Sequence, residues 1–92
     1  MSTRYTTKLI RRAAETAKKQ LRLRTVSTWA SAFRRDKNSA WNLSVVFQHK
    51  RTTDSFEVNG LTEFDLENEE NLVRKIVSGY REFKFIAQQV AK

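Results

Sequence analysis

The spacing of apolar residues changes twice along this chain, and this limits the available folds more than any other feature of the sequence. Apolar residues recur with a helical period over residues 4–22, alternate with polar residues over 41–48, and return to a helical period from Asp65 onward. We therefore expect a helix, a set of half-buried strands and a second helix, in that order. The 92 residues suffice for one core, so a single domain over residues 1–92 is predicted.

The first segment, residues 4–22, is predicted to be an amphipathic helix. Its apolar stripe consists of Leu9, Ile10, Ala13, Ala14, Ala17 and Leu21. The opposite side, interrupted only by Glu15, holds the cations Arg4, Lys8, Arg11, Arg12, Lys18, Lys19 and Arg22. An ordinary solvated helix face mixes charges of both signs, which pair at i and i+4. Because these like charges repel one another, we favour a binding surface for a polyanion over an ordinary solvated face.

The middle of the chain is predicted to form three antiparallel strands. Trp41, Leu43, Val45 and Phe47 alternate with polar or smaller residues, which is typical of a half-buried strand. Residues 56–58 form a shorter strand after the turn "KRTTD", and Asn59-Gly60 closes it. Residues 25–33 fit both a helical and an alternating period. We favour a strand there, because a lone two-stranded hairpin is marginally stable in water, and the turn "RRDKNS" would then join it to the next strand.

The second helix is predicted to begin with Asp65 as its N-cap. Glu67, Glu69 and Glu70 would then lie near the positive end of the helix dipole, where acidic side chains stabilise a helix. Its core-facing stripe consists of Leu66, Leu72, Val73, Ile76, Val77, Tyr80, Phe83, Ala87, Val90 and Ala91. Gly79 in mid-helix indicates either a bend or close packing. Phe85 lies outside the stripe, which indicates either a bend after Gly79 or an exposed apolar contact for another chain.

These elements predict an α+β fold, a small two-layer domain with the order helix, three-stranded antiparallel sheet, helix (αβββα). The order resembles that of double-stranded RNA-binding domains, which recognise the shape and backbone of a duplex. That family begins its second helix with a phosphate-binding lysine cluster, whereas this chain reads "DLENEENLVRK" at the matching place. Membership is therefore not expected, and RNA, if bound, would be held in a different geometry.

Charge is distributed unevenly along the chain, whose formal net charge is +8. Residues 1–52 carry 13 basic and 2 acidic side chains, while residues 53–92 carry 5 basic and 8 acidic ones. Besides the helix face, the candidate binding residues lie in the two predicted turns: Arg34, Arg35 and Lys37 in the first, Lys50 and Arg51 in the second. Successive hairpins lie at opposite ends of a sheet, so a ligand would follow the first helix toward one of them.

Several classes of protein are not expected. The chain has no cysteine, one histidine and two glycines, which exclude most zinc sites, most nucleophile–base pairs and glycine-rich phosphate loops. We therefore expect no enzymatic activity, metal, cofactor or small-molecule substrate. No apolar run is long enough for a membrane span or a secretory signal, so a soluble cytoplasmic protein that makes no membrane contact is expected.

Three side chains allow two interpretations each. Trp29 and Trp41 are candidate stacking platforms for bases, but core packing is favoured for both, because a small core needs large side chains. His49 lies near Asp54 and Glu57 in sequence, which could orient it as a base. An ordinary surface histidine beside a basic turn is favoured.

Two functions fit these expectations. In the first, the protein is a small basic module that binds nucleic acid or a nucleoprotein complex through its cationic helix face. In the second, it is a phage-type inhibitor, similar in size and style to anti-CRISPR proteins, that acts in the host cytoplasm. Such an inhibitor would block the nucleic-acid site of a host nucleoprotein complex. The sequence leaves the choice between DNA and RNA and the oligomeric state open.

Overall fold

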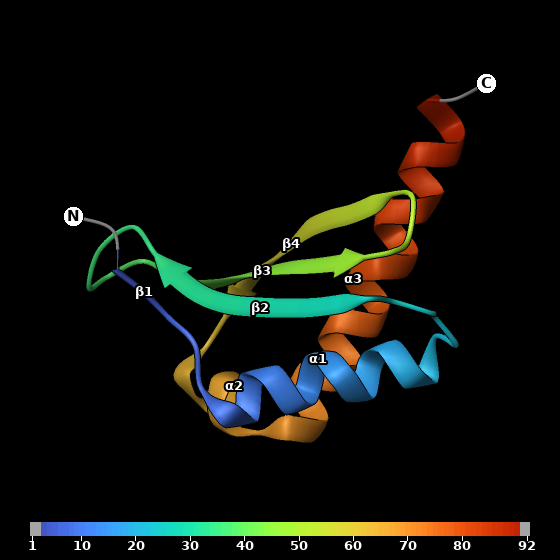
Figure 1. The fold of residues 1–92 in the computed structure, drawn as a ribbon. Coiled ribbons are helices and arrows are strands. Elements are labelled where there is room, and N and C mark those ends of the chain that lie inside the picture. Colours follow the sequence, from blue (N-terminus) through green and yellow to red (C-terminus); the bar gives the residue numbers. More distant parts are fainter. Residues whose placement is uncertain (1–2, 91–92) are drawn as a thin grey trace.

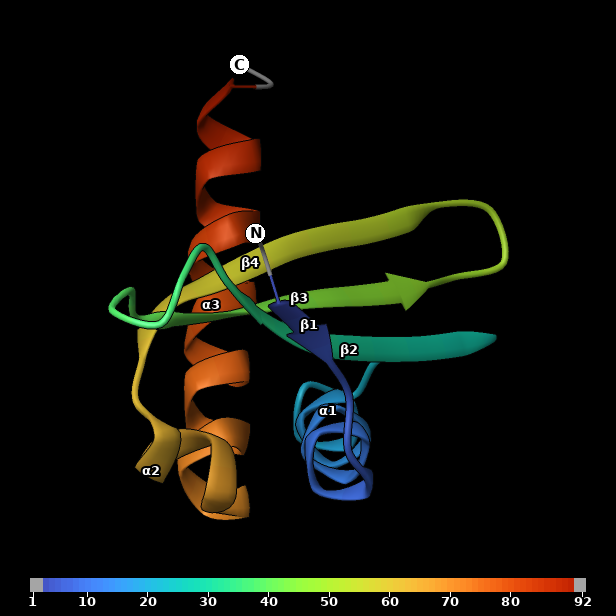
Figure 2. The same ribbon diagram turned by 90° about the vertical axis from the view of Figure 1, so that its left-hand side faces the viewer.

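The computed structural model describes the backbone of residues 3–90 and the side chains of residues 5–90. Helices cover one face of an antiparallel sheet, and no described element covers the other face (Figure 1, Figure 2). The predicted α+β order of a helix, three antiparallel strands and a C-terminal helix is confirmed. The structure adds one short strand at the start of the chain and one short helix before the last one.

Each strand of the sheet is antiparallel to the next, and the spatial order follows the chain. The strands are β1 (Thr3–Tyr5), β2 (Ser27–Arg34), β3 (Trp41–Gln48) and β4 (Thr53–Leu61). The strand predicted at residues 25–33 is confirmed. β4 begins earlier than predicted, because its residues from Thr53 onward pair with the end of β3. β1 was not predicted, since its three residues form a strand only by pairing with β2.

The first helix, α1 (Lys8–Gln20), is shorter than the predicted 4–22. Thr7 is its N-cap, and the Thr7 hydroxyl accepts a hydrogen bond of 3.1 Å from the backbone N–H of Ile10. The placement of Arg4 and Arg22 on the helix is therefore wrong. Arg4 pairs with Phe33 through the backbone of β1, and its side chain lies outside the described residues. Arg22 follows the helix in a left-handed conformation, with a φ of 58°.

The second helical region is two helices, α2 (Glu63–Glu67) and α3 (Glu69–Val90). The prediction of Asp65 as the N-cap is wrong, because Thr62 holds that position. The Thr62 hydroxyl accepts from the backbone N–H of Asp65, while the Asp65 carboxylate accepts from the backbone N–H of Thr62, which completes a capping box. Asn68 separates the helices, and its side-chain oxygen accepts from the N–H of Asn71 in the first turn of α3.

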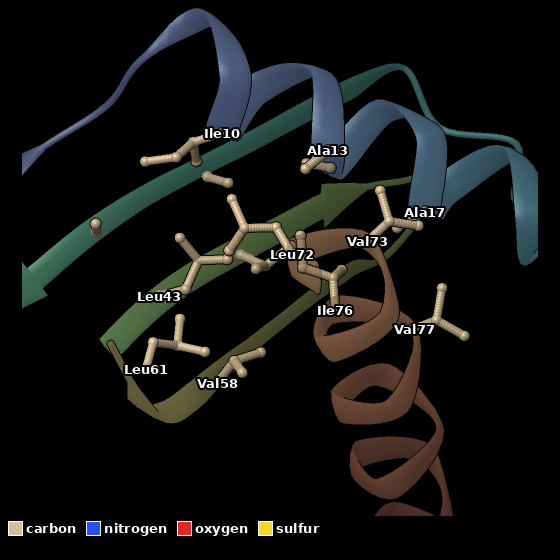
Figure 3. Packing of buried hydrophobic residues seen from close by; sticks show 14 of the residues in the cluster. Ile10, Ala13, Ala17, Leu43, Val58, Leu61, Leu72, Val73, Ile76 and Val77 are labelled. Atoms are coloured by element: carbon tan, nitrogen blue, oxygen red, sulfur yellow. The ribbon is translucent and has the colours of Figure 1, made fainter. Parts of the chain in front are cut away.

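The core lies between the sheet and the pair α1 and α3 (Figure 3). Ile10, Ala13 and Ala17 of α1 point at the sheet, and so does the predicted stripe of α3 as far as Tyr80. Of the two predicted roles for Gly79, close packing is the correct one. A Cβ at this position would lie 3.0 Å from the Val58 Cγ2 atom of β4.

The last turns of α3 extend past β4, at the edge of the sheet (Figure 1, Figure 2). The predicted burial of Ala87 and Val90 is therefore wrong, because the sheet ends before it reaches them; Val90 is 80% exposed. Ala91 lies outside the described residues. Phe85 is 61% exposed, on one uninterrupted helix, which agrees with the predicted exposed apolar position.

Candidate nucleic-acid interface

The cationic face predicted on the first helix exists on α1, but part of its charge is neutralised. The guanidinium of Arg12 lies 3.2 Å from a Glu69 carboxylate oxygen of α3, and the ammonium of Lys18 lies 3.1 Å from Glu15. Lys8, Arg11 and Lys19 are exposed, and no ion pair forms at them within the described part of the chain. These three cations are the ones that remain available to an external anion.

The structure brings two basic segments together that lie far apart in the sequence. The loop after α1 lies beside the β3–β4 hairpin: the backbone N–H of Val26 donates to the Gln48 carbonyl at 2.8 Å, and His49 Nδ1 lies 3.1 Å from the Arg24 carbonyl. Both segments are at the right-hand end of the sheet in Figure 1. We call the exposed cations there the cationic end; they are Arg22, Arg24, Lys50 and Arg51. Arg24 was not among the predicted candidates, because it falls between the helical and strand patterns.

The other hairpin, between β2 and β3, lies at the opposite end of the sheet, so the two basic turns do not meet. Arg34, predicted to be exposed in the first turn, is half-buried at the end of β2. Its guanidinium lies over the Trp41 ring, 4.4 Å from the centroid, and donates to the Lys37 carbonyl at 3.3 Å. Arg35 and Lys37 are exposed at the hairpin tip.

A buried carboxylate fixes the hairpin of the cationic end to α3. Asp54 is 7% exposed and accepts three hydrogen bonds: from His49 Nε2 at 2.9 Å, from the Tyr80 hydroxyl at 3.2 Å and from Lys84 Nζ at 3.0 Å. Burial alone would raise the pKa of Asp54. The hydrogen bonds from Lys84 and His49 outweigh that effect and lower its pKa below the ordinary value. Burial and the neighbouring Asp54 carboxylate raise the pKa of Tyr80 to about 12.

His49 is bonded on both sides of its ring, so the expectation of an ordinary surface histidine is wrong. One ring nitrogen faces the Arg24 carbonyl and the other faces Asp54. The ring therefore links the loop after α1 to β4 and supports the cationic end. Glu57, the other predicted partner, belongs to the opposite face of the sheet by the alternation of β4.

The outer face of the sheet carries the second tryptophan of the chain. Trp29 is 39% exposed, whereas Trp41 is 7% exposed. The predicted burial is therefore confirmed for Trp41 and wrong for Trp29. Ala30 and Ala32 face the helices, so the alternation of β2 turns Trp29 away from them, toward the side that no described helix covers.

The groove between α1 and α3 does not continue the cationic surface. It has a volume of about 670 Å³, and its lining carries charges of both signs, from Glu69, Glu70, Arg74 and Arg81. An extended polyanion would meet acidic side chains there. The favourable path therefore runs from the exposed cations of α1 to the cationic end, not between the two helices.

No helix within residues 3–90 combines the length and the apolar character needed to cross a bilayer. Over the same residues, the structure contains no group of three or more His, Cys, Asp or Glu side chains arranged to hold a metal ion. Among known proteins, no family model, curated protein or solved structure matches this chain.

Proposed function

We propose that this protein is a non-enzymatic module that binds nucleic acid, free or within a nucleoprotein complex. The binding surface would consist of the exposed cations of α1 and the cationic end. The single observation that carries the proposal is the convergence of two basic segments, the loop with Arg24 and the hairpin with Lys50 and Arg51, at one end of the sheet. Holding like charges next to one another costs free energy, and a polyanion that binds across them removes that cost.

The dimensions of this surface suit a phosphate backbone. α1 has 13 residues, and at 1.5 Å per residue it is about 20 Å long. Its cations and those of the cationic end lie on the helix, on the loop that follows it and on the hairpin bonded to that loop. Binding through such contacts releases counterions, so the affinity should fall steeply as the salt concentration rises.

The proposal is tested by measuring nucleic-acid affinity over a salt series for two variants of equal net charge. The test variant combines Arg11→Gln, Lys19→Gln and Arg24→Gln, which remove three cations of the proposed surface. The matched control combines Arg35→Gln, Lys37→Gln and Lys75→Gln, which remove three exposed cations from the opposite hairpin and from α3.

The test variant should lose roughly 10-fold or more in affinity at moderate salt. The slope of its log K against log salt concentration should become shallower by about two. The control should stay close to the wild type. Equal losses in both variants would mean that only the overall charge matters and would overturn the proposed surface. No binding of the wild-type protein to any nucleic acid would overturn direct recognition.

One observation favours the second candidate function, the inhibitor of a nucleoprotein complex. Phe85, Ile86 and Val90 are exposed on the part of α3 that extends past the sheet. Apolar side chains grouped in this way are typical of a protein-binding surface. An inhibitor would place the cationic surface at the nucleic-acid site of its target and hold the complex through this helix end. Capture of a protein complex by wild type and not by Phe85→Ser, without binding to free nucleic acid, would support it.

A further inference from the structure

Trp29 is a large aromatic residue that does not belong to the hydrophobic core. It pairs with Val46 of β3 on the outer face of the sheet, and 39% of its surface is exposed. Its neighbours on this face of β3, Ser44 and Gln48, are polar. A large, part-exposed aromatic ring on a sheet face that no described helix covers, beside Val46 and these polar residues, is a surface on which a planar group can stack.

Trp29 also lies close to the cationic end. It is two residues from Ser27, the first residue of β2, or about 7 Å along the strand. Ser27 pairs with Gln48, the last residue of β3, and the cations of the hairpin follow at Lys50 and Arg51. A strand whose phosphates contact the cationic end therefore has its next bases within reach of the Trp29 ring.

The charges of the outer face agree with this path. Glu57 is an acidic residue of this face, and it lies on β4, paired with Ser44. β4 is two strands away from β2, which corresponds to about 10 Å. An anionic chain is attracted to the cationic end and repelled by Glu57, so the path over β2 and β3, which passes Trp29, is the more favourable one.

We infer that the outer face of the sheet binds the bases of a single-stranded nucleic acid, with Trp29 as the stacking residue and the cationic end holding the phosphates. This inference rests on the proposed function and names its substrate class. Bases in a duplex are already stacked on each other, so a side chain standing on a sheet reaches them only in a single strand. Ser44 and Gln48 supply hydrogen-bonding groups beside the ring.

The test compares wild type, Trp29→Leu and Trp29→Phe. The probes are oligo-dT and oligo-rU of about 12 nucleotides, within the size range of single-strand sites, and a blunt DNA duplex of the same length. Trp29→Leu keeps an apolar side chain without a ring, whereas Trp29→Phe keeps a stacking face. Thermal unfolding of each variant controls for folding, which a change at this exposed position should leave intact.

Wild type should bind at least one of the single strands more tightly than the duplex, with quenching of tryptophan fluorescence. Trp29→Leu should lose roughly 10- to 100-fold in single-strand affinity and most of the quenching, because Trp41 is buried. Trp29→Phe should stay within a few-fold of wild type, and duplex binding should be equal in all three proteins.

The outcomes separate this inference from the proposed function. Equal single-strand affinity in wild type and Trp29→Leu would overturn the role of Trp29 in stacking. Equal binding of duplex and single strands by wild type would overturn the single-strand preference. If binding still depended on Arg11, Lys19 and Arg24, the proposed function would stand. No binding to any of the probes would overturn both.

Discussion

The ammonium of Lys84 in α3 lies 3.0 Å from the carboxylate of Asp54 in β4. His49 and Tyr80 donate to the same carboxylate, so one buried side chain joins the hairpin, the loop after α1 and the long helix. The cationic end thus has a defined position relative to the sheet. A site that recognises a polyanion gains affinity when its cations are held in place before binding.

Asp54→Asn should lower the free energy of unfolding by about 2 to 4 kcal/mol at pH 7, because it leaves the donors of His49, Tyr80 and Lys84 facing a neutral amide in a buried position. The pKa of Asp54 is lowered in the folded protein. Its stabilising contribution is therefore complete above about pH 4, the unfolded value for aspartate, and is lost as the pH falls through the folded value.

Urea unfolding of wild type and Asp54→Asn across this pH range measures the effect. The difference in unfolding free energy between the two proteins should shrink below pH 4. The control Glu57→Gln, at an exposed position, should have nearly the same unfolding free energy as wild type at every pH. A difference that stayed constant with pH would show that the Asp54 charge does not stabilise the fold.

Gly79→Ala should reveal how closely α3 approaches β4. Alanine favours a helix by about 1 kcal/mol over glycine, but its Cβ would lie 3.0 Å from Val58 Cγ2. In a Val58→Ala background, Gly79→Ala should therefore raise the unfolding free energy by the full amount expected from helix propensity. In the presence of Val58, most of that increase should be lost to the close contact. The same change in unfolding free energy in both backgrounds would contradict the close contact.

Trp41→Ala should cost roughly 3 to 5 kcal/mol, because it removes a buried ring that packs edge-on against Tyr5 and under Arg34. Trp41→Phe should cost less than about 1.5 kcal/mol, since the Trp41 Nε1 atom has no hydrogen-bond partner among the described residues. Denaturant unfolding measures both changes. A folded Trp41→Ala variant of wild-type stability that no longer binds nucleic acid would instead make Trp41 a stacking residue.

Phe85→Ser should leave both stability and oligonucleotide affinity unchanged, because the side chain is exposed beyond the sheet. The matched change Phe83→Ser should cost about 1 to 3 kcal/mol, since Phe83 packs against the core and stacks on Phe56 with ring centroids 5.7 Å apart. Unfolding and binding are measured on the same samples. A loss of oligonucleotide binding in Phe85→Ser at full stability would contradict this prediction and would extend the nucleic-acid surface to the end of α3.

Local signals were sufficient where one segment carries its own pattern. The alternation of Trp41, Leu43, Val45 and Phe47 predicts a strand with one buried face, and all four side chains are buried. The stripe of Ile10 and the three alanines predicts the buried side of α1 in the same way. In both segments, the requirement to bury one face sets the period, so the pattern is visible without any partner.

Other features depend on which segments meet. β1 is a strand only because it pairs with the edge of β2. Asp65 and Thr62 are both suitable N-cap residues by type, and Thr62 takes this role because β4 ends directly before it. Trp29 lies in a segment whose two faces differ little in polarity, so the side covered by helices decides its exposure.

The order of helix, strands and helix and the buried stripes could be predicted without any structure, because each depends on spacing within one segment; the excess of cations in the first half is a matter of composition. The meeting of Arg24 with the hairpin cations at one end of the sheet, and the link from Asp54 to His49, Tyr80 and Lys84, could not. Pairing between strands and packing between layers bring together residues whose separation along the chain carries no periodic signal.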